Sequence, residues 1–436
     1  MKIPAERLRA LAARTMDPPV TLAEGAAMAA ALLKRKPKKA RTADPARELR
    51  AALEHVRALD LSPSLSLLSY AVVSGAILRA TDLHCELEIA IPDLGGSGLL
   101  SIPDASAALK GASGLVTWDG ASALEVGSSS VRLLPPPLVE DYPAMSWGAA
   151  IEEPPPVAEG ETPWSADEVH EQDVDAVRLL ARLAAVEHAM SSDWTRPHIA
   201  GALLMLHGGG HVDAAATDGH RLAVTDFTRE QGRADLFIPR RAVELYQRLA
   251  KGARFASVRV RWAWFGRSLE VRGGSEFRER LGRVEVAGQG WRLRSRIPDE
   301  HFPPYQKVVP RAGVMRLDLP RAPLMRALEA LAALKSRTGN TVLEVSEDGS
   351  TLMMSRESPD SGMITHRVPV QLTGERFATA VNAPYLRDAV GSIMGDTIGS
   401  VVVIDAGTSK DGALDPIRVW SPAAPLDMRV VMPCRM

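Results

Sequence analysis

The sequence predicts an α+β protein built from repeated units, and two matching spacings carry that prediction. An apolar run ending in Ala80-Thr81-Asp82 precedes a helix start at Ile102-Pro103. A second run, ending in Ala216-Thr217-Asp218, precedes another helix start at Ile238-Pro239. In both copies the Thr and the Ile are 21 residues apart, which chance resemblance rarely produces. We therefore expect repeats that mix helices with strands.

Two further observations extend the repeat along the chain. Each copy closes alike, with Glu140-Asp141-Tyr142-Pro143 in the first and Glu300-His301-Phe302-Pro303 in the second. A third, more degenerate copy is predicted from a helix, two strands and a second helix start, over Leu324–Lys335, Thr341–Val345, Leu352–Ser355 and Val381–Pro384. Three units of roughly 100 to 140 residues fit a chain of 436 residues.

Residues 1–45 differ from the repeats. They hold an alanine-rich stretch, Ala23–Leu33, and a basic run, Lys34–Lys39. A run of like charges is usually solvated, so an exposed extension is one interpretation, and a basic arm that touches nucleic acid is the other. The first repeat then begins with an amphipathic helix and two strands, over Arg47–Leu59, Leu67–Val73 and Ile77–Ala80.

The second repeat follows Glu152–Gly160, whose prolines and acidic residues are typical of a semi-rigid, exposed linker. Apolar periodicity predicts a helix over Val174–Met190, and a second helix is predicted over Pro239–Lys251, because proline is favoured in a first helical turn. We expect four side chains of the first helix to pack inward, namely Val177, Leu180, Ala184 and Ala185. Helices of all three repeats carry cations that together would match a phosphate backbone.

Composition limits the class of protein. The chain is 46% hydrophobic and 24% charged, with a formal net charge of -1, which argues against indiscriminate nucleic-acid binding without excluding it. No apolar run approaches the roughly 20 residues of a membrane span, and the N-terminus has no signal-peptide pattern, so we expect a cytoplasmic protein. Only Cys85 and Cys434 occur, which excludes a disulfide framework and a four-cysteine metal site.

Several catalytic motifs are incomplete. His207-Gly208-Gly209-Gly210 resembles an esterase oxyanion loop, but the chain has no Gly-x-Ser-x-Gly nucleophile turn. His84-Cys85-Glu86 lacks the Pro-Cys-x-x-Cys partner of zinc deaminases. An enzyme using Asp218, His220 and Arg221 is therefore a minor hypothesis, and a turn that reverses the chain at Asp218 and Gly219 is the alternative.

Six segments carry a resemblance to a known family, and they run in order along the chain as Arg196–Gly201, Ala216–Leu222, Ile238–Ala242, Phe302–Pro310, Val381–Leu386 and Val430–Met436. Together they resemble the bacterial DNA sliding clamp, the beta subunit of DNA polymerase III, over about residues 46–436. Repeats two and three match better than repeat one. The first strand usual in the family has no clear counterpart, and the common ending Met-Pro-Met-Arg-Leu is here Met432-Pro433-Cys434-Arg435-Met436.

The resemblance implies an architecture. It places clamp domains I, II and III at 46–148, 167–306 and 307–436, a linker at 149–166 and an extension at 1–45. Each domain would contain two β-α-β-β-β units. Two chains would close head-to-tail into a homodimeric ring around duplex DNA, with helices inside and sheets outside.

The implied function is that of a processivity factor, a non-catalytic subunit without cofactor or metal. Its partners would be duplex DNA of any sequence, a second copy of itself, the polymerase III catalytic subunit, the clamp loader and other proteins with a clamp-binding motif. An accessory clamp, borne by a plasmid or phage or conferring inhibitor resistance, is the alternative within this class.

The resemblance also implies a partner-peptide pocket between the second and third domains. Carried over by position, its walls would be Ile199, Thr217, Gly219, His220, Arg221, Leu222, Pro303, Lys307, Val308, Asn382, Tyr385, Leu414, Pro416, Val430, Val431, Met432, Pro433, Cys434, Arg435 and Met436. Aliphatic and methionine side chains would form an adaptable floor for an apolar anchor, and the polar groups would fix the peptide's direction.

Two further sets complete the expected sites. The candidates for the DNA-facing lining are Arg178, Arg182, Arg196, His198, Arg240, Arg241, Arg248, Arg326, Arg337 and Arg387. In the dimer interface, an edge strand with Val131, Leu133 and Leu134 would face a helix end with Ala333 and Leu334.

Overall fold

A computed structural model describes the parts of the chain from Asp44 to Cys434, and a compact unit begins at Pro45. The described residues are 44–59, 66–133, 136–137, 139, 142, 151–155, 157, 160–226, 234–251, 257–271, 275–310, 315–334, 340–358, 362–376, 378–393, 400–406 and 416–434. The expected extension, with its basic run, lies outside them except for its last two residues.

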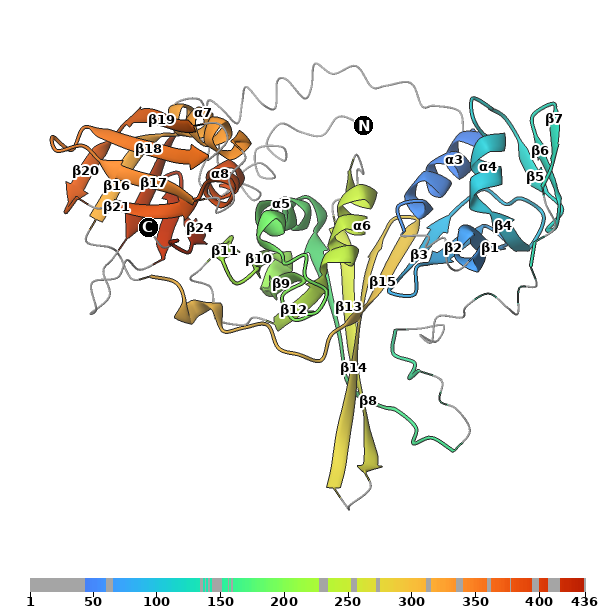
Figure 1. Ribbon diagram of the computed structural model, residues 1–436. Coiled ribbons are helices and arrows are strands. Elements are labelled where there is room, and N and C mark those ends of the chain that lie inside the picture. The colour runs from blue at the N-terminus through green and yellow to red at the C-terminus, as the bar shows by residue number, and fades with distance from the viewer. Residues whose placement is uncertain are drawn as a thin grey trace, which may run out of the picture. The chain divides into compact units, whose positions relative to one another are not determined.

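The second domain shows the repeating unit most completely (Figure 1). Its first unit contains β8 (Ser165–Asp175), α5 (Ala176–Val186), β9 (Gly201–Leu206), β10 (Val212–Thr217) and β11 (Arg221–Val224). Its second unit contains β12 (Ala234–Pro239), α6 (Arg240–Ala250), β13 (Ser257–Val271), β14 (Ser275–Gly288) and β15 (Trp291–Ile297). Both follow the order β-α-β-β-β that the resemblance implies.

The two units exchange their first strands. Strand β12 joins the sheet of the first unit, in the order β12-β9-β10-β11, and β8 joins the sheet of the second, in the order β8-β13-β14-β15. A helix follows each of these two strands directly. Asp175 caps α5 by accepting from Arg178 N at 2.7 Å, and Pro239 supplies a fixed φ before α6.

The third domain repeats this plan. One unit contains β16 (Met315–Pro320), α7 (Arg321–Ala333), β17 (Asn340–Val345), β18 (Thr351–Ser358) and β19 (Gly362–Pro369). The other contains β21 (Ala378–Asn382), α8 (Ala383–Ser392), β22 (Val401–Ala406), β23 (Ile417–Ser421) and β24 (Ala424–Val431). A short extra strand, β20 (Gln371–Gly374), extends the sheet beside β16.

The first domain has the same plan without one strand. It contains α3 (Pro45–Val56), β1 (Tyr70–Ser74), β2 (Ile77–Thr81) and β3 (Cys85–Ala90), and then β4 (Gly98–Ser101), α4 (Ile102–Ala108), β5 (Val116–Trp118), β6 (Ala123–Val126) and β7 (Ser129–Arg132). The described residues provide no strand before α3, so the sheet β5-β6-β7 has three strands. A short 3-10 turn at Ser66–Ser69 occupies the start of the strand predicted over Leu67–Val73.

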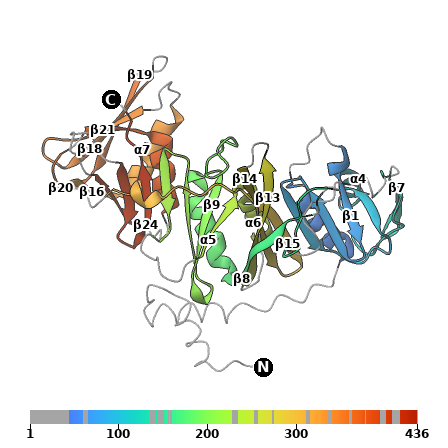
Figure 2. The same cartoon turned by 90° about the horizontal axis from the view of Figure 1, so that it is seen from below.

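The sheets run without a break across both domain boundaries (Figure 2). Strand β3 of the first domain pairs antiparallel with β15 of the second, and β11 of the second pairs antiparallel with β24 of the third. In each case the last strand of a first unit joins the last strand of a second unit. The two boundaries therefore follow one rule.

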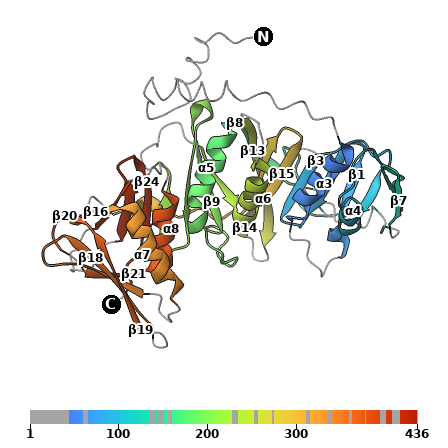
Figure 3. The ribbon, with the colours of Figure 1, turned by 90° about the horizontal axis from the view of Figure 1, so that it is seen from above.

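The six helices of the three domains form a continuous row (Figure 3). Each helix contacts the next in the order α4, α3, α6, α5, α8, α7. Inward-facing residues recur at helical spacing, as Leu49, Leu53 and Val56 do in α3. The helices therefore form one layer, and the sheets form the other.

The structure corrects the predicted face of α5. Val177 is 70% exposed, and Ala184 is also exposed, so the expected inward set is wrong there. The buried side chains are Ala176, Leu179, Leu183 and Val186, together with Ala185. The interior stripe lies about one position away from the predicted one because alanines on both faces of this helix blur the apolar period.

The ribbon of β13 and β14 is long and continues past the body of the second domain, accompanied by β8 (Figure 1). Stacked cations and rings support its outer half. Arg267 lies 4.5 Å from the ring centre of Trp164, and Arg280 lies 4.6 Å from that of Trp264. Trp164, in the segment predicted as a linker over 149–166, therefore packs on the ribbon, and β8 begins at Ser165.

Candidate functional site

A cavity of about 400 Å³ opens at the boundary of the second and third domains. It lies where β11 pairs with β24 and where the connector after β15 passes, and we call it the groove. Its lining residues are Arg196, His198, Ile199, Thr217, Gly219, Arg221, Leu222, Pro303, Pro304, Tyr305, Lys307, Val308, Val430 and Met432.

The floor of the groove is apolar and anchored in a small core of its own. Leu222 and Val430 are buried opposite each other across the β11–β24 pair. Tyr305 is buried beneath them and donates its hydroxyl to the sulfur of Met205 at 3.2 Å. Val308 and Met432 remain 49% and 41% exposed. Large apolar side chains left open around a cavity are typical of a binding surface.

The structure brings half of the expected pocket residues into the groove lining. These ten are Ile199, Thr217, Gly219, Arg221, Leu222, Pro303, Lys307, Val308, Val430 and Met432. The remaining expected residues lie elsewhere or outside the described chain. Leu414, Arg435 and Met436 are in the last category, and Val431 is fully buried in the third-domain core.

Other expected pocket residues hold the third-domain side in place. Asn382 caps α8, since its side chain accepts from Tyr385 N at 3.2 Å. Cys434 N donates to Ala380 O at 2.6 Å, which fixes the chain after β24 against β21. His220 stacks on Tyr385 with ring centres 6.2 Å apart. Pro416 and Pro433 are partly buried and do not line the groove.

The turn between β10 and β11 presents the polar edge. Thr217 donates its hydroxyl to Arg221 O at 2.7 Å and accepts from Gly219 N at 3.1 Å. Asp218 Oδ1 accepts from His220 N and Arg221 N at 2.9 and 3.0 Å. Gly219 has φ 91°, a conformation that glycine adopts without strain. These bonds account for the polar cluster as a turn that reverses the chain.

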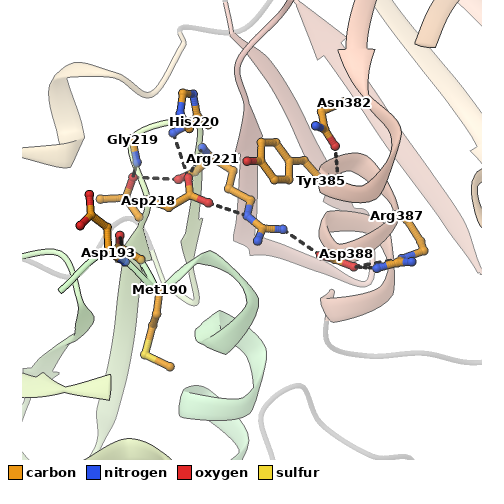
Figure 4. Close-up of polar contacts among 12 residues, drawn as sticks. Met190, Asp193, Asp218, Gly219, His220, Arg221, Asn382, Tyr385, Arg387 and Asp388 are labelled. Carbon is orange, nitrogen blue, oxygen red and sulfur yellow. Dashed lines mark hydrogen bonds and ion pairs between the residues drawn. The ribbon is translucent and has the colours of Figure 1, made fainter. Parts of the chain in front are cut away.

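Arg221 is part of the groove wall, and Figure 4 shows its side chain reaching from the turn toward α8. Its Nε donates to Asp218 Oδ2 at 2.9 Å, and its Nη1 donates to Asp388 Oδ2 of α8 at 2.8 Å. The guanidinium also lies 4.4 Å from the ring centre of Tyr385. Arg221 therefore bridges the second and third domains.

A second, more polar cavity of about 910 Å³, which we call the inner cleft, shares Arg221 with the groove. It is lined by residues of α5, α6, α7 and α8 and of the segments near them, including Glu187, Asp193, Arg240, Glu329 and Arg387. Arg196 and Arg221 line both cavities. Charges of both signs line this cleft.

The structure divides the expected DNA-facing residues. Arg248 and Arg326 are exposed on α6 and α7 and make no ion pair with the described part of the chain. Arg387, on α8, pairs with Asp388 at 2.7 Å and remains 41% exposed. Arg178 contacts His211 near the start of α5. Arg337 lies outside the described residues.

The other expected DNA-facing residues have different roles. Arg182 is only 15% exposed and pairs with buried Asp213 at 3.1 Å. Arg241 reaches the first domain, where it pairs with Asp82 at 3.1 Å and donates to Ala58 O at 2.8 Å. We therefore remove both from the set that could contact phosphate, because buried carboxylates hold them.

Three more cations of this set also have partners. Arg240 pairs with Glu244 at 3.0 Å and donates to Met190 O at 3.0 Å. Arg196 pairs with Asp193 at 2.9 Å and lines the groove, as His198 does. The predicted pocket residues did not include Pro304 and Tyr305, which line the groove, although the motif Phe302–Pro310 contains both.

The expected interface residues fall at two free edges. Val131 is half-buried on β7, Leu133 is buried in its own core, and Leu134 lies outside the described residues. Ala333 is exposed at the end of α7, and Leu334 follows it, half-buried. Helix α7 contacts the edge strand β19.

The described residues were also compared with two further features, a metal site and a membrane-spanning helix. Across these ranges, no group of three His, Cys, Asp or Glu side chains is placed to hold a metal ion. No helix in the same ranges is long and apolar enough to cross a membrane.

Comparison with known proteins places this architecture in a family. Residues 174–304 match the family described as DNA polymerase III beta subunit, central domain. The beta sliding clamp of Caulobacter vibrioides is 25% identical over 228 residues, which are 51% of this chain and 56% of that protein. The beta sliding clamp of Streptomyces coelicolor is 26% identical over 67% of this chain and 69% of its own length. This chain is similar to the bacterial beta sliding clamps, and its residues 174–304 match the central domain of that family.

Solved structures extend the likeness to nearly the whole chain. The DNA polymerase III beta subunit of Thermotoga maritima covers 90% of this chain and 98% of its own, with a TM-score of 0.68 and 19% identity. The Caulobacter crescentus polymerase III beta structure covers 90% and 99%, with a TM-score of 0.67 and 23% identity. At such identities the likeness establishes the fold. In sequence, the aligned part spans little more than half of the Caulobacter relative.

Proposed function

We propose that this chain is a DNA sliding clamp, a non-catalytic ring that tethers a DNA polymerase and other proteins to duplex DNA. The observation that carries the proposal is the rule obeyed at both domain boundaries. The last strands of the units pair as β3 with β15 and as β11 with β24, which leaves the last strands β7 and β19 as sheet edges, each paired on one side only. These two are the edges that the same rule would join between two chains.

A head-to-tail dimer would satisfy both edges at once. Strand β7 of each chain would pair with β19 of the other, and the two closed sheets would bury edges that otherwise invite aggregation. Met363 on β19 is 69% exposed, and Val131 on β7 is partly exposed, which supplies apolar surface for such a contact. The ends of the helix row, α4 and α7, belong to the same two units as β7 and β19.

The layer of helices suits DNA of any sequence. Exposed Arg248, Arg326 and Arg387 lie on three helices of the row, where they would meet phosphates rather than base edges. Topological linkage would then retain the ring on DNA while weak contacts let it slide. A chain with a net charge near zero is compatible with this arrangement.

The groove suits a short peptide from a polymerase, a clamp loader or another partner. Its volume of about 400 Å³ holds one or two large apolar side chains, and exposed Val308 and Met432 border it. Arg221, Thr217 and Lys307 supply polar contacts at its edge. The similar clamps of Bartonella birtlesii and Pseudomonas aeruginosa have been solved with griselimycin bound, which is a property of those two proteins.

Oligomeric state tests the ring. We expect light scattering at micromolar concentration to give a dimer, and a Met363→Asp variant to give a folded monomer, because a charge would face the apolar contact on β7. Val169→Asp is the matched control, since Val169 is also an exposed apolar residue on an edge strand, β8, and it should leave the dimer intact. A stable wild-type monomer would argue against the proposal.

Peptide binding tests the groove. We expect calorimetry to detect a clamp-motif peptide with the full chain and no binding after deletion of Met432–Met436, which leaves the core residue Val431 in place, while the dimer persists. The deletion removes Met432 and the Cys434 anchor on β21. Equal binding after the deletion would show that the groove assignment is wrong.

A further inference from the structure

Arg221 is shared by the groove and the inner cleft, and the structure shows what holds it there. Its side chain is 14% exposed and bonded at two ends, to Asp218 on its own turn and to Asp388 on α8. Tyr385 stacks beneath the guanidinium. Two acceptors from different domains fix the plane of a guanidinium far better than one acceptor, because two of its nitrogen atoms, Nε and Nη1, are held at once.

Asp388 differs from Arg221 in position. It lines the inner cleft and is absent from the groove lining, so a peptide in the groove would not touch it. One carboxylate oxygen accepts from Arg221, and the other accepts from Arg387 Nε and Nη2 at 3.0 and 2.7 Å. Asp388 therefore connects a wall of the groove to an exposed cation of the helix row (Figure 4).

The local charges keep Asp388 ionised. Burial by itself raises the pKa of this carboxyl group, but the hydrogen bonds from Arg387 and Arg221 outweigh burial, and the pKa is lowered overall. On the other side of the cleft, burial and the charges of Arg429 and Arg221 lower the pKa of His188 to about 3. The histidine is thus neutral at physiological pH, and the carboxylates are the counter-ions of Arg221.

We propose that Asp388 is a positioning residue for peptide binding, which holds Arg221 in the groove wall from outside the groove. This inference rests on the proposed function of the groove. It also links the two faces of the chain. Arg387 and Arg221 both donate to the carboxylate of Asp388. If an anion such as a DNA phosphate binds Arg387 in place of Asp388, then Arg221 is the remaining charged partner of Asp388. Phosphate binding at the helix row and peptide binding in the groove would then favour each other.

The central experiment compares peptide affinity across matched variants of the full-length chain. Asp388→Asn keeps the size of the side chain and removes its charge, and we expect it to weaken the clamp-motif peptide about tenfold or more, because a hydrogen bond between charged groups is lost. Asp388→Glu restores the charge and should recover most of the affinity. Glu329→Gln is the control, since Glu329 lines the same cleft without contacting Arg221.

A double-mutant cycle separates positioning from general damage. If Asp388 acts through Arg221, then Asp388→Asn adds little to the loss caused by Arg221→Gln. Additive losses would show two independent effects and would overturn the proposal. The midpoint of thermal unfolding should change by the same amount in Asp388→Asn and Asp388→Glu. The peptide affinity should fall in Asp388→Asn and recover in Asp388→Glu.

The outcomes distinguish this inference from the function on which it rests. If the wild-type chain does not bind the peptide, the groove assignment fails. If the wild type binds and Asp388→Asn binds equally well, the groove stands and the positioning role is refuted. For the link to phosphate, we expect Arg387→Gln to bind the peptide at least as tightly as the wild type, and a tenfold weaker complex would contradict it.

Discussion

Asp82 and Asp218 occupy the same place in two copies of one turn. Asp82 Oδ1 accepts from the backbone N–H groups of His84 and Cys85 at 3.0 and 2.7 Å, and Asp218 Oδ1 accepts from the corresponding two residues of its own turn at 2.9 and 3.0 Å. The threonine before each aspartate also bonds alike. Thr81 and Thr217 each donate to a carbonyl four residues on and accept from an N–H two residues on.

The two copies of the turn now serve different contacts. Asp82 Oδ2 pairs with Arg241 across the boundary of the first and second domains. Asp218 Oδ2 pairs with Arg221 at the boundary of the second and third domains. The same kind of turn thus braces two different domain junctions. The third residue of each turn also differs, because Leu83 has φ 73° where the second copy has Gly219.

This difference predicts opposite effects of swapping the residues. A leucine with positive φ is strained by about 1 to 2 kcal/mol, so Gly219→Leu should lower the free energy of unfolding by about 1 kcal/mol or more. Leu83 is 38% exposed, so Leu83→Gly loses little packing and should leave stability equal or raise it by up to about 1 kcal/mol. Urea denaturation of both variants measures the difference. A strongly destabilised Leu83→Gly would contradict the strain argument.

A second prediction concerns the ion network at the first domain boundary. Arg294 is 4% exposed and bonds two carboxylates at 2.9 Å each, Glu86 across the β3–β15 pair and Glu285 across the β14–β15 pair. Arg294→Met leaves both carboxylates buried without this partner, which should destabilise the chain by about 3 to 5 kcal/mol. Arg259→Met, on an exposed pair of the same sheet, should change stability by less than about 1 kcal/mol. If chemical denaturation gives the same loss of unfolding free energy for both variants, the buried network is no more stabilising than the exposed pair.

A third prediction concerns acid. Burial, and then the charges of nearby arginines, lower the pKa of His188 from its ordinary value of 6.5 to about 3 in the folded chain. Between these values the unfolded chain binds a proton that the folded chain does not, so stability rises with pH through this window and falls on acidification, by at most about 1.4 kcal/mol per unit. Urea denaturation at about pH 5 and about pH 7.5 should show a smaller difference for His188→Gln. An unchanged difference would assign the acid sensitivity to other groups.

A fourth prediction separates the cations that face DNA from those that do not. Neutralising Arg248 and Arg326 together should lower the slope of log affinity against log salt for linear duplex DNA by about 1 to 2, because each phosphate contact releases counter-ions. Arg259→Gln, on the sheet side, should leave the slope unchanged. If all three substitutions act equally, the helix row is not the DNA-facing layer.

A fifth prediction addresses the basic run outside the described residues. Ten of the 52 Lys and Arg and four of the 53 Asp and Glu lie in residues 1–44, so this segment carries a formal charge of +6, and residues 45–436 carry -7. If the run is an arm that touches DNA, replacing the five cations of Lys34–Lys39 by Gln should lower the same salt slope by several units. A scrambled order of the same residues should retain it. An unchanged slope in the Gln variant favours the solvated extension.

The sequence predicted the repeat, the helices or their starts and a few strands, because local signals were strong there. Ile102-Pro103 and Asn382 mark helix starts that the structure contains, and the spacing of Leu49, Leu53 and Val56 fixes the buried face of α3. The phase of α5 was not predictable in the same way, since alanine is compatible with both faces of a helix. Domain boundaries within 46–436 remain predictions.

Side-chain partners across long sequence separations could not be read from the sequence. Arg221 and Asp388 are 167 residues apart, and Arg241 and Asp82 are 159 apart. Basic residues on a helix suggest a DNA-facing surface, but a buried carboxylate such as Asp213 redirects one of them inward. The groove was anticipated through family resemblance, and local pattern alone would not have joined Leu222 to Val430.

Encirclement of DNA is the central claim, and retention on closed and cut DNA tests it most directly. The dimer would be loaded by a clamp loader and ATP onto a nicked circular plasmid, separated from free protein, and the plasmid then cut once or left closed. We predict that protein stays on the closed circle and is lost from the cut plasmid, and that Met363→Asp is retained on neither. Equal retention on both forms, or equal loss from both, would contradict the ring.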